Sequence, residues 1–281
     1  MKPYSVRIIF CFPRILRKAT DRRVFARLLL EKMQKNGSVE YAGYAKDEYL
    51  YRDLLRHVGK GVIAQSSGLS LPQKDHITNT IRATIEKCRK KLPLPATIFV
   101  FIFPYFPTEE DAFAGVMGFT PYSSVFHLFV SPQTFTQESL ESTTAHELNH
   151  AIFYYYHYER FGKYTLLDDC IVEGLAENFR EEVIGGEPAL WSRALTKKEA
   201  LRTLDSIRSL LRSKSSRIRH DILFGSKQYK RWTGYSVGYW LIKEFRKKHR
   251  KVSWEEIMQM NPESILIYSM RKTLTSASNA S

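Results

Sequence analysis

The chain has 281 residues, of which 43% are apolar and 26% are charged, a composition typical of a soluble globular protein. Its length allows one large domain or two subdomains, and no stretch approaches the ~20 apolar residues that a transmembrane helix needs. The three cysteines, Cys11, Cys88 and Cys170, are odd in number and widely spaced. This spacing argues against a disulfide framework and against a cysteine zinc site.

Residues 4–12 form a short apolar run that contains Arg7 and leads into the basic segment 13–18. A secretory signal peptide would instead carry a longer apolar core that ends at a small-residue cleavage site. We therefore predict a strand at the N-terminus and a cytoplasmic protein.

Three helices are predicted after this strand, at residues 22–33, 46–58 and 72–91. The third follows Ser70, has Pro72 in its first turn and ends in a run of basic residues, as a helix start and a helix end should. We interpret residues 1–95 as an N-terminal scaffold that consists of one strand and several helices.

Two sheet features come next. Residues 96–103 are a continuous apolar run of strand length, which indicates a buried central strand. Residues 115–119 and 124–130 are separated by turn-forming residues, and this pattern predicts a β-hairpin. Gly115 and Gly118 indicate either a bulge or turn, or a place where another chain approaches the strand closely.

The most specific motif is His146-Glu-x-x-His150, within a stretch that is predicted to be helical from its expected N-cap, Ser139, to the break at Gly162. At 3.6 residues per turn, the two histidines lie on one helical face, one turn apart, where two imidazoles can share a zinc ion. Glu147 is displaced from that face. It is therefore better placed to take a proton from water as a general base than to ligate the ion.

A second helix follows the motif and supplies a candidate third ligand. Asp168 or Asp169 is its expected N-cap, and Glu173 follows a loop that is long enough to reverse the chain. Two histidines and one carboxylate would leave the fourth position of a tetrahedral zinc ion open. Glu177, one turn further along, is either a partner for the outer nitrogen of a ligand histidine or an exposed carboxylate.

Two other ligand sets fail on geometry or on sequence. His157 lies seven residues beyond His150, which places it ~10 Å further along the same helix and too far away to share the ion. The three-histidine zinc motif requires Gly at position 153 and His at position 156, where this chain has Phe153 and Tyr156.

The C-terminal part is predicted to be helical. Capping boxes at 196–199 and 253–256 begin two helices, the first of which extends to about residue 213. A last helix begins at Pro262, and the small residues from 275 onward indicate a mobile tail.

A further predicted helix at 231–245 carries Gly234 and Gly238 one turn apart, a smooth stripe where another helix can pack closely. Tyr235 and Tyr239 share a neighbouring face. Either phenol could donate a hydrogen bond to the oxyanion that forms during attack on a carbonyl, although core packing is the commoner use of such a tyrosine. His220 is a third candidate for this role.

The motif His146-Glu-x-x-His150, followed by Val172-Glu-Gly-Leu-Ala-Glu177, resembles the gluzincins, the zinc peptidases with a glutamate ligand. With the later Gly234-Tyr-Ser-Val-Gly-Tyr239, residues 95–245 are similar to the predicted zinc-dependent proteases of the YjaZ-like family. This resemblance implies a zinc-dependent peptidase that acts through a metal-activated water.

The resemblance also implies a role for each matching residue. His146, His150 and Glu173 would be the zinc ligands, and Glu147 would be the catalytic base. Tyr235, rather than Tyr239, would stabilise the oxyanion. In a gluzincin-like cleft, an exposed edge strand of the 115–130 hairpin would hold an extended substrate by main-chain hydrogen bonds.

The positive charge is concentrated in one part of the sequence. Residues 193–251 contain 18 Lys and Arg against 4 Asp and Glu, an excess that equals the net charge of the whole chain, +14. Such a surface can hold nucleic acid, an anionic membrane face or an acidic partner. Solvated helix faces produce the same pattern, and no nucleic-acid module is recognisable.

We therefore expect an α+β protein with a gluzincin-like metallopeptidase fold. Its parts would be a scaffold (1–95), the sheet with the zinc helix (96–163), a helical subdomain with the third ligand (164–274) and the tail (275–281). The active-site cleft would lie between the sheet-containing part and the helical part, and the substrate would be a peptide or protein. The alternative function is a catalytically silent zinc domain that binds nucleic acid or an acidic partner through residues 193–251.

Overall fold

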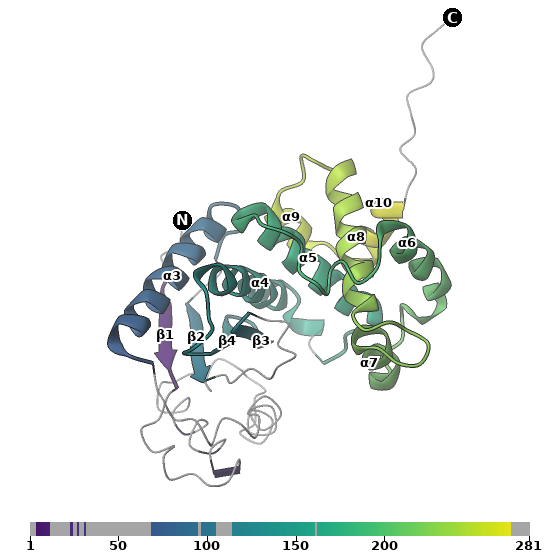
Figure 1. The fold of residues 1–281 in the computed structure, drawn as a ribbon. Coiled ribbons are helices and arrows are strands. Elements are labelled where there is room, and N and C mark those ends of the chain that lie inside the picture. Colours follow the sequence, from purple (N-terminus) through teal and green to yellow (C-terminus); the bar gives the residue numbers. More distant parts are fainter. Residues whose placement is uncertain are drawn as a thin grey trace, which may run out of the picture. The chain divides into compact units, whose positions relative to one another are not determined.

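The computed structural model of the chain describes residues 4–11, 23–24, 27, 31, 69–94, 97–104, 114–160 and 162–270. The chain divides into two compact units, Met1–Tyr155 and Tyr156–Ser281. The first combines a mixed sheet with helices, and the second is helical throughout its described part (Figure 1). The predicted α+β class is therefore confirmed, whereas the predicted boundaries at 95, 163 and 274 stay predictions. None of the described helices has the length and apolar character that a membrane crossing requires.

The sheet of the first unit contains strands β1 (Val6–Phe10), β2 (Ile98–Pro104), β3 (Val116–Tyr122) and β4 (Val125–Val130). Their order is β1-β2-β4-β3. Strands β1 and β4 run parallel to β2, and β3 runs antiparallel to β4. The predicted N-terminal strand, central strand and hairpin are thus confirmed. Strands β2 and β4 are buried, as expected for apolar runs in the middle of a sheet.

Two helices of the first unit accompany this sheet. Helix α3 (Leu71–Arg89) begins at the predicted position, where Ser70 and Gln73 form a reciprocal capping box. Helix α4 (Gln137–Tyr156) carries the histidine motif. An ion pair of 3.2 Å between Lys87 and Glu141 joins the two helices.

Two predicted N-caps are wrong, and the reason is the same in each case. The Thr136 hydroxyl accepts from the Ser139 amide, and Ser139 in turn accepts from the Thr136 amide, so α4 begins at Gln137. Helix α5 is capped in the same way by Thr165, with Asp168 as the reciprocal partner. In each case a threonine three residues earlier forms the cap, and the predicted residue supplies the other half of the box.

The described part of the second unit is built from helices α5 (Leu166–Ile184), α6 (Lys197–Ser206), α7 (Ser216–Phe224), α8 (Thr233–Lys248), α9 (Trp254–Gln259) and α10 (Pro262–Met270). The capping boxes predicted for α6 and α9 are confirmed. Helix α6 ends at Ser206, earlier than expected, and a short 3-10 turn follows.

Helices α5 and α8 form the centre of the second unit, and the predicted glycine stripe lies between them. A Cβ atom on Gly238 would stand 1.8 Å from the Cys170 carbonyl oxygen, and one on Gly174 would stand 2.2 Å from the Gly238 carbonyl oxygen. The two backbones are therefore in direct contact at this point, which only glycine permits.

The predicted helix 46–58, most of the predicted helix 22–33 and the predicted tail from residue 275 lie outside the described residues.

Candidate metal centre

The histidine motif of the predicted metal centre lies in the buried middle of α4. Every residue from Thr144 to Phe153 is buried, so this part of the helix is enclosed on all sides. The His146 and His150 rings are one turn apart, with centroids separated by 4.6 Å and planes at 89°. These two side chains are only 8% and 6% exposed.

Glu147 completes a cluster of possible ligands with the two histidines. Ligand-type atoms of His146, Glu147 and His150 all lie within 4.8 Å of one another. Two imidazoles and a carboxylate are a donor set that zinc accepts. The side chains in this part of α4 therefore fit a metal ion.

Two residues of strand β3 contact the Glu147 side chain. The Thr120 hydroxyl lies 2.7 Å from Glu147 Oε2 and 3.0 Å from the Glu147 carbonyl oxygen. A Cβ atom on Gly118 would stand 2.3 Å from both Glu147 Cγ and Oε1. The sequence did not identify Thr120, and its only signal is position: residues 118 and 120 share one face of a strand.

The two alternatives that the sequence left open for the glycines of this hairpin are now resolved. Gly115 has φ +77 and abuts the backbone of Thr134 and Phe135, so it is a turn residue. Gly118 does provide space for a close approach, but the Glu147 side chain fills that space. Strand β3 is one of the two edge strands of the described sheet, and β1 is the other.

The candidate third ligand, Glu173, lies on α5 in the second unit and is half-buried. Asp169, one turn before it, is held by two hydrogen bonds of 2.5 and 2.7 Å from Arg219 of α7. Burial raises the pKa of Asp169, the Arg219 contacts oppose that rise, and the charge of Glu173 adds to it. These contacts fix the start of α5, the helix that carries Glu173.

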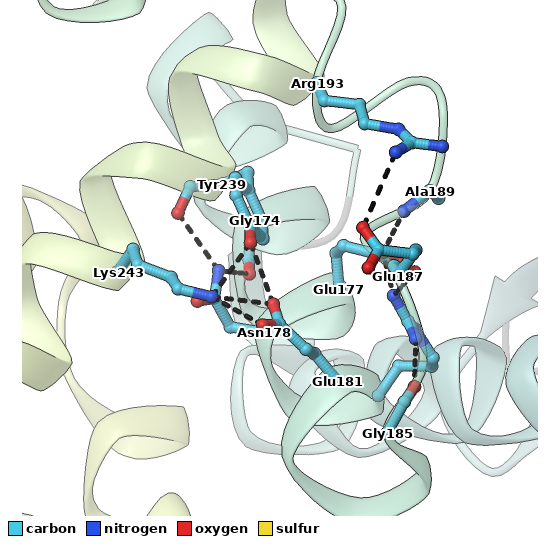
Figure 2. A network of polar contacts seen from close by, with 11 residues as sticks. Gly174, Glu177, Asn178, Glu181, Gly185, Glu187, Ala189, Arg193, Tyr239 and Lys243 are labelled. Atoms are coloured by element: carbon cyan, nitrogen blue, oxygen red, sulfur yellow. Dashed lines mark hydrogen bonds and ion pairs between the residues drawn. The ribbon is translucent and has the colours of Figure 1, made fainter. Parts of the chain in front are cut away.

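Glu177 is not the exposed carboxylate that was one of the two roles considered for it from the sequence, and its role as a partner of a ligand histidine stays a prediction. It is buried in an ion pair with Arg180, and its Oε1 atom also accepts a hydrogen bond of 2.8 Å from the Ala189 amide (Figure 2). Arg180 in turn donates to the carbonyl oxygens of Gly185 and Glu187. The pair therefore fastens the loop that follows α5.

The three candidate oxyanion donors have different surroundings. The Tyr239 hydroxyl lies 2.8 Å from Glu181 Oε2 and 2.9 Å from Lys243 Nζ (Figure 2). Burial raises the pKa of this phenol. Tyr235 is half-buried, with its ring edge-on to Phe224, and the His220 side chain is 67% exposed. The Tyr239 hydroxyl is thus already engaged within the second unit.

Much of the basic region is paired with acidic side chains. A groove of about 620 Å³ in the second unit has both basic and acidic residues in its lining. Three ion pairs involve lining residues: Lys197 with Glu244, Lys243 with Glu181, and Arg246 with Glu182. Some of the basic residues in 193–251 therefore form ion pairs that join helices of this unit.

Comparisons with known proteins agree with the chemistry of this site. The family model described as Predicted Zn-dependent protease (DUF2268) matches residues 77–267, a range that includes both the histidine motif and α5. The chain is also similar to the uncharacterized protein YjfC of Bacillus subtilis (strain 168). The two are 23% identical over 215 residues, which cover 70% of this chain and 72% of YjfC. No solved structure matches the chain.

Proposed function

We propose that this chain, which belongs to the predicted Zn-dependent protease family (DUF2268), is a zinc-dependent metallopeptidase that hydrolyses peptide bonds. The observation that carries the proposal is the buried cluster on α4, where ligand-type atoms of His146, Glu147 and His150 lie within 4.8 Å of one another. Two histidines one turn apart with an adjacent glutamate are the arrangement that metallopeptidase chemistry requires. The substrate is a peptide or a protein.

In this proposal, His146, His150 and Glu173 hold the ion. The assignment of Glu173 is supported by the resemblance of residues 172–177 to the gluzincin ligand helix, and Arg219 fixes the start of that helix through Asp169. Zinc, when bound, lowers the pKa of water and polarises a carbonyl group. Three protein ligands leave one coordination position open for this chemistry.

Glu147 acts as the general base and acid. Its carboxylate takes a proton from the attacking water and then delivers that proton to the leaving amine, so the same group serves both halves of the reaction. Helical periodicity places Glu147 one position round from the face that the two histidines share, and this displacement supports the base role over a ligand role.

Tyr235 donates a hydrogen bond to the oxyanion that forms when the carbonyl is attacked. Tyr239 is the weaker candidate because its hydroxyl is engaged by Glu181 and Lys243. The assignment of Tyr235 otherwise rests on the family resemblance.

The test of the proposed function is Glu147→Gln. This variant keeps the shape of the side chain but cannot accept a proton, so we expect it to bind zinc like the wild type and to lose at least ~100-fold in kcat on a cleaved peptide. Peptide-library cleavage with zinc analysis of the same samples measures both quantities. A Glu147→Gln protein that hydrolyses peptides at the wild-type rate would contradict the mechanism.

A further inference from the structure

Two residues of strand β3, Gly118 and Thr120, contact the side chain of Glu147 in the candidate metal centre. We propose that Thr120 is a positioning residue for Glu147 and that Gly118 forms the slot in which the Glu147 side chain lies. This inference rests on the proposed function, in which Glu147 is the base. The contacts that define it, however, can be tested without any catalytic activity.

Strand β3 follows α4 closely on the side of the helix that carries Glu147. The Thr143 hydroxyl lies 3.5 Å from the Val116 carbonyl oxygen at one end of the contact. At the other end, just after β3, the Ser124 amide donates to the Ala151 carbonyl oxygen at 3.4 Å. Glu147 lies between these two points along the helix. Its side chain is therefore held against the strand by contacts on both sides.

Gly118 sets the space for this side chain. The three heavy atoms nearest to a Cβ atom at position 118 would be Cγ, Oε1 and Cδ of Glu147, at 2.3, 2.3 and 2.5 Å. Any larger residue would thus displace the glutamate itself rather than some other neighbour. A carboxylate confined in this way loses little rotational freedom when the reaction begins.

Thr120 sets the orientation of the carboxylate. Both Thr120 and Glu147 are 6% exposed, so little water competes for their hydrogen bond. A threonine hydroxyl has one proton, and a carboxylate is a stronger acceptor than a backbone carbonyl. We therefore assign that proton to the 2.7 Å contact with Oε2, which leaves Oε1 to accept the proton in catalysis.

The activity test compares two substitutions of Thr120. Thr120→Val removes the hydroxyl at nearly constant volume, and we expect kcat to fall roughly 10- to 100-fold with little change in KM or zinc content. Thr120→Ser retains the hydroxyl and is expected to keep most of the wild-type kcat. Thr143→Val is the matched control, because it removes a hydroxyl from the same helix–strand contact one turn away from Glu147.

Two outcomes of this comparison would overturn the proposal. One is a Thr120→Val enzyme with the wild-type kcat. The other is a Thr120→Ser enzyme as slow as Thr120→Val, because the hydroxyl would then not be the group that matters.

The contact between Gly118 and the Glu147 side chain can be tested by stability instead of activity, from the melting temperature of zinc-free protein in a calorimeter. Gly118→Ala is expected to lower Tm by roughly 5 °C in the wild-type background. It should cause a clearly smaller shift in the Glu147→Ala background, where the three clashing atoms are absent. Equal shifts in both backgrounds would contradict the slot. If the wild type cleaves no peptide, the proposed function fails, but this comparison still decides whether Gly118 and Glu147 are in contact.

Discussion

Glu177 lies on the helix that carries the candidate ligand Glu173, and it forms an ion pair with Arg180. Both side chains are almost completely buried. The two side chains also form hydrogen bonds with the backbone of Gly185, Glu187 and Ala189. A buried charge that loses its partner is strongly destabilising, because its desolvation is no longer compensated.

We therefore expect Glu177→Ala to lower the free energy of unfolding of the second unit by about 3 kcal/mol or more. All four tryptophans of the chain lie between residues 191 and 254, so tryptophan fluorescence in a urea titration reports on this unit. Glu244→Ala is the control, since its partner Lys197 is 44% exposed and such a pair contributes less than ~1 kcal/mol. Equal losses in the two variants would show that the buried pair is no more important than the exposed one.

His157 makes the stability of the second unit depend on pH. Its Nε2 atom lies 2.9 Å from the Met258 carbonyl oxygen. Burial lowers the pKa of His157, the hydrogen bond to Met258 partly opposes that change, and the charge of Arg160 adds to it. The unfolded chain, with a pKa of ~6.5 for this group, therefore binds a proton at a pH where the folded chain does not.

The sign of the pH effect follows from this difference. The contribution of His157 is fully present above the unfolded pKa and is lost as the pH falls below it toward the folded pKa. Between pH ~7.5 and ~5, the unfolding free energy should decrease less steeply in His157→Gln than in the wild type. Urea titrations followed by tryptophan fluorescence measure both slopes, and identical slopes would exclude His157 as a source of the pH dependence.

At the scale of elements, the packing of α5 on α8 depends on backbone contact at glycine. An alanine at position 238 would place Cβ 1.8 Å from the Cys170 carbonyl oxygen, which cannot move unless the helices separate. At Gly234, one turn earlier on α8, the nearest atom is Leu223 Cδ2 at 2.7 Å. The end of a leucine side chain can move aside.

Gly238→Ala is therefore expected to destabilise the second unit by about 3 kcal/mol, while Gly234→Ala costs clearly less. The two variants carry the same substitution on the same helix, so their helix propensities do not distinguish them. Urea unfolding followed by tryptophan fluorescence compares them directly. A Gly234→Ala variant that is the less stable of the two would contradict the backbone contact at Gly238.

Local features of the fold could be predicted from the sequence, because the interactions that specify them span only a few residues. The capping boxes at Thr196 and Ser253 are confirmed, and so are the helix start after Ser70 and the hairpin. The caps at Thr136 and Thr165 were not predicted because a second possible capping residue follows each of them after three positions, Ser139 and Asp168, and only the reciprocal hydrogen bonds select one. The contact of Thr120 with Glu147, 27 residues apart, depends on how the sheet packs and has no local signal.

At the scale of the whole molecule, local sequence patterns were sufficient to predict the α+β class, but they did not predict the order of the strands in the sheet. Strand β1 pairs with β2 although about 90 residues separate them in the sequence. The sequence also locates the net charge of +14 in residues 193–251, but it does not show where those charges find partners. Asp169, Glu181 and Glu182 of α5 each pair with a basic residue of that region.

Elemental analysis of the purified protein tests most directly whether the chain binds a zinc ion. We expect about one zinc per chain in the wild type and clear loss of zinc in His150→Ala and in Glu173→Ala. His157→Gln, which removes a histidine outside the proposed ligand set, should retain the metal. Wild-type protein that stays free of metal after exposure to zinc would contradict the proposed metal centre, and a Glu173→Ala protein with full zinc content would remove Glu173 from the ligand set.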